Sequence, residues 1–413
     1  MTDHVPFPTG LGVAQARERI VELCKSHAMP AERIELAYGL GRVLSADAVA
    51  PFDIPGFTNS AMDGFAVRGR DLPEAGEKTF RLAGEILAGG VEAPEVGPGE
   101  CVRITTGAPV PRGADTVVMK ENTRTRENEV MIAAGTARGA NVRPAGEDYR
   151  AGDIGVARGQ TLTAALLGVL ASFGSTHVEV ARRPRAVLIT TGDELVAPGL
   201  PLGFGQIHDS NRYSLGGLIE QHGAILLRHE RVRDEPAALR DALTRAGADA
   251  DFVISSGGVS AGEADFLPGL IAEIGNVYFW KVRIKPGMPF LFGKVGNALM
   301  FALPGNPVSG VAIFLTLIKP GLSAMAGAAA PATQLRARLA VPVDKRHARA
   351  EFQRARLACD TQGTLWATPE SRQGSGMLRG LAEADVLIVL PEGAHAFAAG
   401  DVLEILPLPG WPR

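Results

Sequence analysis

AVLITTGDEL, at residues 186–195, and DFVISSGGVSAGEAD, at residues 251–265, share one pattern: an apolar strand-like run, then glycine, then carboxylates. Between them the sequence predicts a helix, a strand and a second helix, at residues 210–223, 224–232 and 236–247. Strands that alternate with helices are typical of a parallel sheet covered by helices on both faces. We therefore predict a three-layer α/β domain over residues 184–327.

The rest of the chain has a different character and predicts a multidomain protein of α/β and β parts. Helices are expected at 13–26 and 164–173, and short β-type runs between turns fill the stretch that separates them. The β pattern returns beyond residue 330, where it fits a small barrel or a sandwich. Besides the α/β domain, the predicted domains are a discontinuous linking domain at 8–50 and 143–183, a β-rich insertion at 51–142 and a C-terminal β domain at 328–413.

The composition is that of an ordinary soluble globular protein. A chain of 413 residues that is 46% hydrophobic is expected to form two to four domains. Its net charge of −3 provides no basic field for nucleic acid or for an anionic membrane. Three cysteines without C-x-x-C spacing argue against a disulfide framework or a zinc site and favour a reducing compartment. With no signal pattern and a longest apolar run, 162–173, too short to cross a bilayer, we expect a cytoplasmic protein.

The two strand-end loops carry the residue types that bind phosphate and a hard cation. In an open parallel sheet, ligands bind beyond the carboxyl ends of the strands. The small residues Gly257, Gly258 and Ser260 let backbone N–H groups approach a phosphate at a helix N-terminus. Carboxylates beside phosphate repel it unless a cation such as Mg²⁺ bridges them, which makes Glu194 and Asp265 candidate metal ligands. The same acids could instead be first-turn helix residues, and the glycines plain turn residues.

A third segment, FWKVRIKPGMPF at 279–290, adds positive charge. Lys281, Arg283 and Lys285 alternate along a predicted strand, so their side chains are expected to share one face. Three cations on one face could bind an oxyanion or a polyphosphate, although a solvated edge strand would look the same. LPGNPVSG, at 303–310, repeats the strand–glycine–helix pattern with a proline placed to start a helix; its prolines could form a pocket wall or a plain turn.

These motifs, taken together, resemble those of one known family. They are SAMDGFAV (60–67), RITTGAPVPRGADTVVMKE (103–121), NVRPAGEDYRAGD (141–153), ITTGDEL (189–195), SGGVSAGEAD (256–265), IKPGMP (284–289), LPGNPVSG (303–310), EFQRA (351–355) and RQGSGML (372–378). In this order they resemble the molybdopterin molybdenumtransferases, the MoeA/gephyrin E-domain family. The resemblance covers nearly the whole chain.

The resemblance implies an elongated four-domain subunit with a molybdopterin-binding α/β domain, a linking domain that also dimerises, and a C-terminal β-barrel. It implies a homodimer whose active cleft lies between domains of the two chains. The implied reaction is the Mg²⁺-dependent insertion of molybdate into adenylylated molybdopterin, which yields molybdenum cofactor and AMP. The implied partners are these small-molecule substrates and proteins of cofactor synthesis and delivery, with no nucleic acid and no membrane.

The resemblance also assigns roles to positions of this chain. The implied catalytic positions are Asp63, Thr106, Asp148, Asp234, Lys281 and Lys285; the metal ligands are Glu194 and Asp265; and Pro304, Pro307, Arg354 and Ser375 join Gly257, Gly258 and Ser260 as substrate- or oxyanion-binding positions. Outside the family context, the polar residues of the inserted region are ordinary loop residues, and Asp234 is readable as a helix N-cap. An arginine and a serine from the β domain, in contrast, could bind tetrahedral molybdate.

One position departs from the family pattern. The family commonly reads K-P-G-K-P where this chain reads KPGMP, so Met288 replaces a lysine that would face the oxyanion. Methionine has no proton to donate. Three consequences stay open at this point: the other cations suffice, the affinity for molybdate is reduced, or the preferred oxyanion differs.

The sequence shows no Ser-His or Cys-His pairing, so we predict electrostatic positioning rather than a covalent nucleophile. Attack on the phosphoanhydride by molybdate and attack by water are both compatible with the sequence. Two rival functions fit the sequence less well. A nucleotide pyrophosphatase resembling the competence-damage proteins leaves the flanking motifs AMDGFAV and RQGSG unexplained, and a non-catalytic scaffold would need a long linker or a further domain that this sequence lacks.

Overall fold

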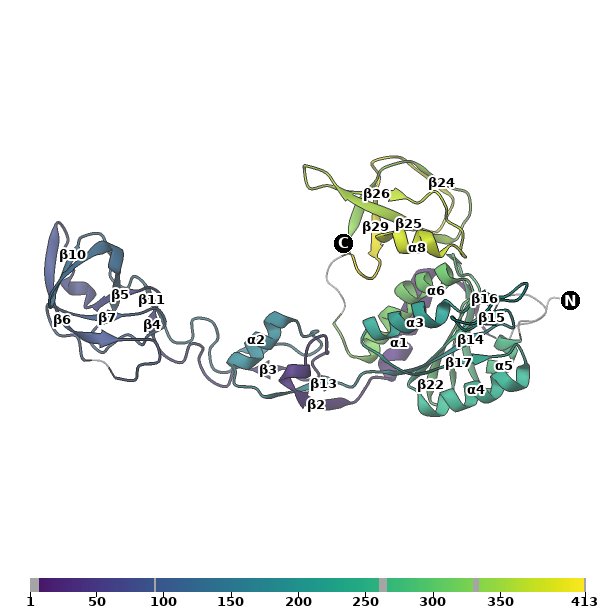
Figure 1. Ribbon diagram of the computed structural model, residues 1–413, viewed down its shortest axis with the longest axis horizontal. Helices are drawn as coiled ribbons and strands as arrows, with labels where there is room; N and C mark the ends of the chain where they lie inside the picture. Colours follow the sequence, from purple (N-terminus) through teal and green to yellow (C-terminus); the bar gives the residue numbers. More distant parts are fainter. Residues whose placement is uncertain (1–6, 93, 260–265, 330–333, 412–413) are drawn as a thin grey trace.

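The computed structural model describes residues 7–92, 94–259, 266–329 and 334–411. The molecule is elongated (Figure 1). An α/β body lies at one end with a small β-barrel beside it, a slender linking region follows, and a β-rich inserted unit forms the opposite end. The chain passes from the body through the linking region to the inserted unit and returns by the same route.

A seven-stranded sheet forms the centre of the α/β body. Its order is β1 (Thr9–Leu11), β19 (Gly275–Val282), β21 (Leu291–Val295), β22 (Ala298–Leu303), β18 (Phe252–Ser256), β14 (Arg185–Thr191) and β17 (Ile225–Val232). The last four strands pair in parallel, as the alternating sequence pattern predicts. Strand β21 runs antiparallel to both of its neighbours, so the sheet is mixed rather than purely parallel.

Helices cover both faces of this sheet. Helices α4 (Pro236–Asp249) and α5 (Leu267–Ile274) pack on one face. The other face carries α1 (Val13–Ser26), α3 (Asn211–Gln221), α6 (Pro307–Ile313) and α7 (Lys319–Met325). The two faces have separate apolar cores, which confirms the predicted three-layer arrangement.

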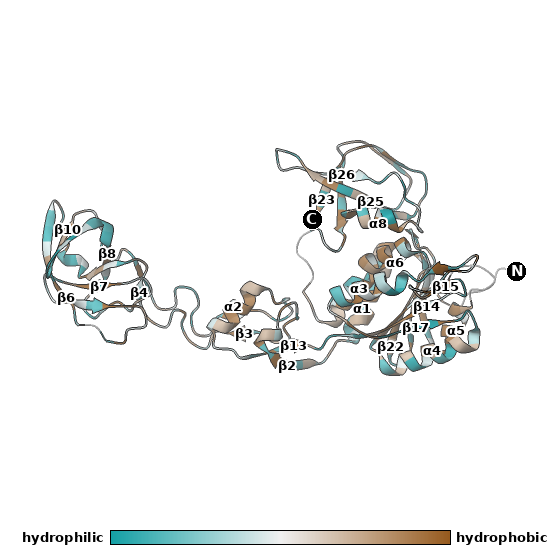
Figure 2. Cartoon of the chain, viewed as in Figure 1, coloured by the Kyte–Doolittle hydropathy of each residue, from teal (hydrophilic) through white to brown (hydrophobic). Residues whose placement is uncertain are grey.

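One helical stretch of the body is long and apolar enough to be compared with a membrane span. Residues Pro307–Met325 comprise α6, a π-helical segment (Phe314–Ile318) and α7, and reach the necessary length and composition. However, 83% of this stretch is buried inside the molecule. Its apolar residues, visible in α6 in Figure 2, face the other helices and the sheet, so it is the core helix of the domain.

The N-terminal segment differs from its predicted place in the linking domain at 8–50. Strand β1 pairs in parallel with β19, at the edge of the body sheet. Helix α1 forms as predicted, but its buried face, which includes Ile20 and Cys24, packs against α7. The physical reason is the amphipathic helix itself, whose apolar face finds a large core in the body and only a small one in the linking region.

The linking region consists of outgoing and returning segments paired side by side. Strand β2 (Ala31–Glu35) pairs with β13 (His177–Ala181), β3 (Ala48–Val49) with β12 (Ile154–Val156), and β4 (Asn59–Ser60) with β11 (Val142–Arg143). Helix α2 (Ala164–Ser172) covers the β3–β12 pair, and a 3₁₀ turn (Leu36–Tyr38) follows β2. All of these pairs are antiparallel, as expected for a chain that leaves and comes back.

The inserted unit is built on a six-stranded sheet. Its order is β8 (Thr116–Met119), β5 (Gly64–Val67), β7 (Glu100–Ile104), β6 (Glu77–Ile86), β10 (Glu129–Ala133) and β9 (Thr123–Arg126), with 3₁₀ turns at Gly69–Asp71 and Lys120–Asn122. Two small apolar clusters hold it together. The unit has its own core, which agrees with the β-type runs seen in the sequence.

The C-terminal region closes into a five-stranded barrel. The ring is β25 (Ala350–Cys359), β26 (Leu365–Pro369), β23 (Arg336–Leu339), β29 (Val402–Pro407) and β27 (Val386–Leu390), which pairs again with β25. The C-terminal region also contains helix α8 (Leu378–Glu383) and the strand pair β24 (Val343–Lys345) and β28 (His395–Phe397). The α/β body has one further strand pair, β15 (Leu195–Val196) and β16 (Ile207–His208). The sequence left a barrel and a sandwich open, and the closed ring decides for the barrel.

The body and the barrel share a short strand. Strand β20 (Ile284–Lys285) follows β19 in the body but pairs in parallel with β25 of the barrel. In this register Lys285 lies opposite Glu351. The KPGMP segment therefore runs along the junction of the two domains.

Candidate active site

A cleft of about 1010 Å³ lies at the carboxyl ends of β22, β18 and β14, between the body and the barrel. These strands are neighbours in the sheet, so the loops that follow them meet at one edge. Among the sequence-predicted positions, the cleft is lined by Glu194, Gly258, Lys281, Lys285, Pro304, Pro307 and Ser375. Side chains from four separate motifs thus come together in one chain.

The loop after β18 approaches the loop after β14 closely. Gly257 has a φ of +104°, and a Cβ atom there would lie 2.5 Å from the Thr191 hydroxyl oxygen and 2.6 Å from its carbonyl oxygen. Only glycine fits both the backbone angle and the space. Gly257 therefore brings the two strand ends into contact, and Gly258, which follows it, lines the cleft.

Asn211, at the start of α3, connects two loops at the floor of the cleft. Its side-chain amide donates to the Ser256 hydroxyl at 2.8 Å and to the Gly305 carbonyl at 2.6 Å. One side chain thereby connects the ends of β18 and β22. Asn211 is 8% exposed, and its Oδ1 atom has no protein partner among the described residues, which leaves an acceptor free in the cleft wall.

A buried polar cluster adjoins this floor, and its central residue, Asp209, lines the cleft. The Asp209 carboxylate accepts from the Thr190 hydroxyl at 2.6 Å and from the Arg212 backbone N–H at 3.0 Å. His229 Nε2 lies 2.8 Å from the same hydroxyl and 3.5 Å from Asp209. Burial alone would raise the pKa of Asp209, but these hydrogen bonds hold it below its usual value. Asp209 thus caps α3 with its side chain, whereas Ser210, which precedes the helix, forms no side-chain cap hydrogen bond.

The three predicted cations do not share one face. Lys281 and Lys285 line the cleft, whereas the Arg283 guanidinium donates to Glu392 and to the Gly10 carbonyl, away from it. The alternation fails because Lys281, near the end of β19, has a φ of +60°, a left-handed backbone conformation, and because Arg283 lies in the break between β19 and β20. The Lys281 ammonium lies 4.1 Å from the centroid of the Trp280 ring.

Lys285 is held by a buried carboxylate of the barrel. Its Nζ atom lies 2.9 Å from Glu351 Oε1, and His347 Nε2 lies 3.0 Å from the other oxygen. Glu351 is 5% exposed. Burial opposes its charge, but the ion pair with Lys285 holds the pKa of Glu351 below its usual value. The pair fixes the lysine at the domain junction, with its side chain still partly exposed to the cleft.

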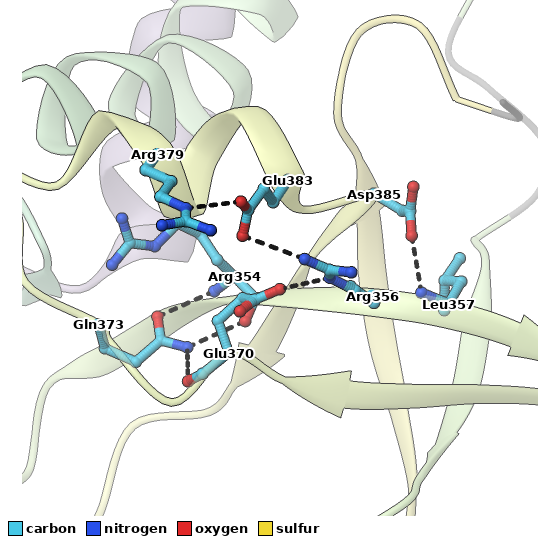
Figure 3. Close-up of polar contacts among 8 residues, drawn as sticks. All are labelled: Arg354, Arg356, Leu357, Glu370, Gln373, Arg379, Glu383 and Asp385. Atoms are coloured by element: carbon cyan, nitrogen blue, oxygen red, sulfur yellow. Dashed lines mark hydrogen bonds and ion pairs between the residues drawn. The ribbon is translucent and has the colours of Figure 1, made fainter.

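Arg354 occupies a different place from the one that the sequence suggested. It is 1% exposed, and its guanidinium donates to the carbonyls of Arg372, Gly374 and Met377 at 2.7–3.0 Å. Gln373 brackets its backbone, donating to the Arg354 carbonyl and accepting from its N–H (Figure 3). Arg354 therefore holds the 372–378 loop from behind and does not line the cleft.

The loop that Arg354 holds carries Ser375 to the cleft. The Ser375 carbonyl accepts from the Val308 N–H at 3.1 Å, so the loop is docked on the first turn of α6. Pro307 begins this helix, as the sequence predicts, and the buried Pro304 forms part of the cleft wall. Ser375 and the two prolines thus line the same space.

Glu194 is the described residue of the cleft that best suits a hard cation. Its side chain is exposed toward the cleft and forms no ion pair with any described residue. Asp209, the neighbouring acid, is already engaged by Thr190 and a backbone N–H. Asp265 and Ser260 lie outside the described residues. Within those residues no group of three or more potential metal ligands occurs.

Four predicted positions lie away from this cleft. Asp63 and Thr106 meet in the inserted unit, where the Thr106 N–H and hydroxyl donate to Asp63 Oδ1 at 2.8 and 2.9 Å. The hydrogen bonds from Thr106 lower the pKa of Asp63. Asp148 is exposed where the inserted unit joins the linking region, and Asp234 lies in the turn between β17 and α4, whose N-cap is Glu235.

Sequence reasoning missed several residues that shape the cleft. Asp209 and Asn211 stand at the start of the helix predicted at 210–223, and polar residues at a helix start are a signal that could have drawn attention. Arg349 and Glu351 also line the cleft, but Arg349 immediately precedes the barrel strand β25 and Glu351 lies within it. Nothing in their local sequence shows that this strand would meet the body.

Comparison with known proteins bears on the whole chain. The family profile of the MoeA N-terminal region (domain I and II) matches residues 11–174, that of a probable molybdopterin binding domain matches 187–324, and that of the MoeA C-terminal region (domain IV) matches 336–408. The chain is 35% identical over 400 residues to the molybdopterin molybdenumtransferase of Haemophilus influenzae, covering 96% of this chain and 98% of that protein. It is 36% identical to the molybdopterin molybdenumtransferase 2 of Mycobacterium tuberculosis, covering 91% and 94%.

A solved structure gives the same result for the fold. The crystal structure of the molybdopterin biosynthesis MoeA protein from Pyrococcus horikoshii OT3 superposes with a TM-score of 0.84 at 26% identity. The match covers 97% of this chain and 100% of that one. The likeness therefore includes the inserted unit and the barrel as well as the α/β body.

Proposed function

Because this chain belongs to the molybdopterin molybdenumtransferase family, we propose that it inserts molybdate into adenylylated molybdopterin in a Mg²⁺-dependent reaction that releases AMP. The chain is a transferase of molybdenum cofactor biosynthesis with a molybdopterin-related substrate. The adenylylated form of the substrate, the metal and the release of AMP are the proposed parts.

The observation that carries the proposal is the cleft at the strand ends. It combines glycine-rich loops and the start of a helix, which suit a pyrophosphate, with lysines from the body and a serine from the barrel loop. Its volume of about 1010 Å³ fits a substrate larger than a nucleotide alone. Lys281 and Lys285 would offset the charges of phosphate and molybdate, and neither needs to form a covalent bond.

The residues of the cleft fit Mg²⁺. Mg²⁺ is usually bound by one or two carboxylates together with substrate phosphates, and Glu194 offers a carboxylate without a competing ion pair. Glu194 and Asp265 are the proposed ligands. When bound, the ion would neutralise the charge of the pyrophosphate. The protein's own part is to orient the phosphates on the β14 and β18 loops and to hold molybdate near Ser375.

We further propose that the enzyme acts as a homodimer with its cleft completed by the second subunit. Within one chain, the Asp63–Thr106 pair lies in the inserted unit, at the opposite end of the molecule from the cleft (Figure 1). A second copy is the way for that pair to approach a cleft. We place the enzyme in the cytoplasm, with small-molecule substrates, with proteins of cofactor synthesis as partners, and without a nucleic-acid or membrane partner.

The assay is AMP release from adenylylated molybdopterin by the full-length protein in the presence of molybdate and Mg²⁺. Glu194→Gln and Asp265→Asn should abolish release while far-UV circular dichroism stays unchanged, whereas the neighbouring Asp193→Asn should stay active. A protein that splits the substrate without molybdate would be a pyrophosphatase, and one that never splits it would be a scaffold. Normal AMP release by Glu194→Gln would refute the metal assignment.

A complementation experiment tests the shared cleft. Neither Asp63→Asn nor Glu194→Gln should be active alone, but a refolded equal mixture should recover about a quarter of wild-type activity. Half of the dimers are then mixed, and each mixed dimer has one intact cleft of two. Absence of recovery in a mixture shown to contain mixed dimers would exclude the shared cleft and leave the single-chain reaction untouched.

A further inference from the structure

Arg283 is the cation of the 279–290 segment that does not reach the cleft, and it lies where the body meets the barrel. Its backbone N–H donates to the Leu11 carbonyl of β1 at 2.8 Å, and its carbonyl accepts from the Ala350 N–H of β25 at 3.0 Å. Its guanidinium donates to the Gly10 carbonyl and to the Glu392 carboxylate, the latter at 2.9 Å. One residue therefore connects the edge strand of the body with two segments of the barrel.

Glu392 reaches the body at a second point, the start of α1. Its other carboxylate oxygen lies 3.3 Å from the Val13 nitrogen, whose N–H has no partner within the helix. The N-cap residue, Gly12, has no side chain to fill this place. A Cβ atom there would lie 2.6 Å from Glu392 Oε1 and 3.1 Å from Arg283 Nη2. Glycine at position 12 therefore leaves room for the ion pair, which we call the Arg283–Glu392 clamp.

The clamp is linked to the cleft through a buried lysine of the barrel. Lys345 is 2% exposed and donates to two barrel carbonyls. Burial lowers the pKa of Lys345, and the attraction of Glu351 and Glu392 opposes that effect. Glu392 pairs with Arg283, and Glu351 pairs with Lys285. Charges of opposite sign thus follow one another along the domain junction, from the clamp to the cleft.

The barrel can transmit a displacement, because it has a closed sheet and an apolar core of its own. It also docks on the cleft side, where the Val308 N–H donates to the Ser375 carbonyl at 3.1 Å. Among the described residues, Ser375 lines the cleft and Arg283 does not. Movement at the clamp would thus reach Ser375 through the barrel and not by direct contact.

We propose that Arg283 is a positioning residue, whose clamp with Glu392 sets the placement of the barrel on the body and so the distance of Ser375 from the body lysines. The inference rests on the proposed function for the chemistry that the cleft performs. The clamp itself forms without substrate, so its effect on the barrel is measurable in the protein alone.

The test is native-state hydrogen exchange of the full-length protein, read in peptides that contain the amides of Ala350 and Val308. Arg283→Gln removes the charge, and both amides should exchange about three- to tenfold faster, the range of a partly exposed ion pair. Ala350 bonds to Arg283 itself, whereas Val308 bonds to Ser375. Faster exchange at Val308 therefore reports movement of the whole barrel.

A matched control comes from an ion pair that lies within the body. Arg240 pairs with Glu273, joins α4 to α5 and has a side chain 43% exposed, against 47% for Arg283. Arg240→Gln should leave both amides unchanged, because its ion pair contains no barrel residue.

Two further substitutions test the clamp from its other sides. Glu392→Gln should raise exchange as Arg283→Gln does, and the double variant should add little, because both changes remove the same contact. Gly12→Ala should also open the clamp, since the new methyl group takes the space of the two side chains. Gly12 has a φ of −66°, which alanine adopts freely, so α1 should keep its circular dichroism signal.

Kinetics separate positioning from binding. In the AMP-release assay, Arg283→Gln should lower kcat about three- to tenfold and leave the KM for the nucleotide substrate within about twofold of wild type, because it changes alignment and removes no ligand of that substrate. Arg283→Lys keeps the charge opposite Glu392 and should recover most of the loss.

Three results would overturn the proposal. Exchange unchanged at both amides would show that the clamp holds nothing, and an increase confined to Ala350 would make Arg283 a local contact. Additive effects of Arg283→Gln and Glu392→Gln would show that the two residues do not act together. Failure of the proposed function is seen separately, as absence of AMP release by the wild-type protein, and leaves the exchange result unaffected.

Discussion

Replacing Arg354 with methionine tests whether this arginine positions the 372–378 loop or binds the anion itself. The change keeps the length and much of the volume of the side chain but removes its charge and its donors. Three carbonyls, those of Arg372, Gly374 and Met377, lose their partner at once. The substitution acts on a side chain that is 1% exposed, so no solvent group replaces it without movement.

The expected cost follows from those three bonds. A hydrogen bond to a charged group contributes about 1.5–3 kcal/mol, and a buried acceptor left without a donor costs about 1–3 kcal/mol. Burial of the guanidinium, which lowers its pKa, offsets part of this. Because the loop can relax toward water, we expect its opening free energy to fall by about 2–4 kcal/mol, equal to thirtyfold or more in exchange rate.

The assay is hydrogen exchange of the loop amides, measured beside molybdate binding. Arg354→Lys should recover at most a fraction of the loss, because one ammonium cannot span three carbonyls, whereas a direct anion ligand would tolerate lysine better. Arg356→Gln is the matched control, since Arg356 lies two residues along the same strand and pairs at the surface with Glu370 and Glu383 (Figure 3). Unchanged loop exchange in Arg354→Met together with lost molybdate binding would refute the positioning role.

Three further predictions concern titratable groups. Burial and Lys319 lower the pKa of His222 to about 4, so that below pH 6.5 the unfolded chain protonates this histidine more readily than the folded protein does. The free energy of unfolding should therefore fall by about 1–2 kcal/mol as the pH drops from 6.5 to 4. His222→Gln should reduce this pH dependence in urea melts recorded over the same pH range. Burial raises the pKa of the Cys24 and Cys101 thiols to about 12, whereas Cys359 is exposed. A thiol reagent should therefore modify Cys359 alone in the native protein and all three cysteines in the unfolded protein. Fast modification of Cys24 in the native state would contradict the packing of α1. Glu351→Gln leaves Lys285 unpaired beside the buried Lys345 and should lower the free energy of unfolding by about 1–3 kcal/mol, whereas the exposed Glu35→Gln should change it by less than about 0.5 kcal/mol.

The parts of the fold that were predictable from sequence are those written in local patterns. The apolar runs at β14 and β18, each followed by glycine, identified adjacent parallel strands and the loops at their ends. The amphipathic pattern of α1 gave its limits correctly. It did not give its partner, because the pattern shows which face is apolar and not which core receives it.

The parts that could not be predicted depend on long-range contacts. The alternation of Lys281, Arg283 and Lys285 assumed one regular strand, but Lys281 has a left-handed backbone and Arg283 lies in the break between β19 and β20, where it pairs with Glu392 instead. Arg354 was expected at the cleft from the family resemblance, yet the 372–378 loop, which carries a separate motif, takes up its donors. The approach of Arg349 to Met288 joins residues 61 positions apart. No local rule relates them.

The paired segments of the linking region have a mechanical consequence. Outgoing and returning backbone are bridged at successive points, from β2 with β13 near the body to Ile54 with Tyr149 and β4 with β11 near the inserted unit. A single connecting segment could rotate about its backbone bonds, whereas two hydrogen-bonded segments resist twisting and bending. Any torque on the inserted unit is then passed to the body through two backbones at once. The reach and direction of the inserted unit are thus set within the single chain.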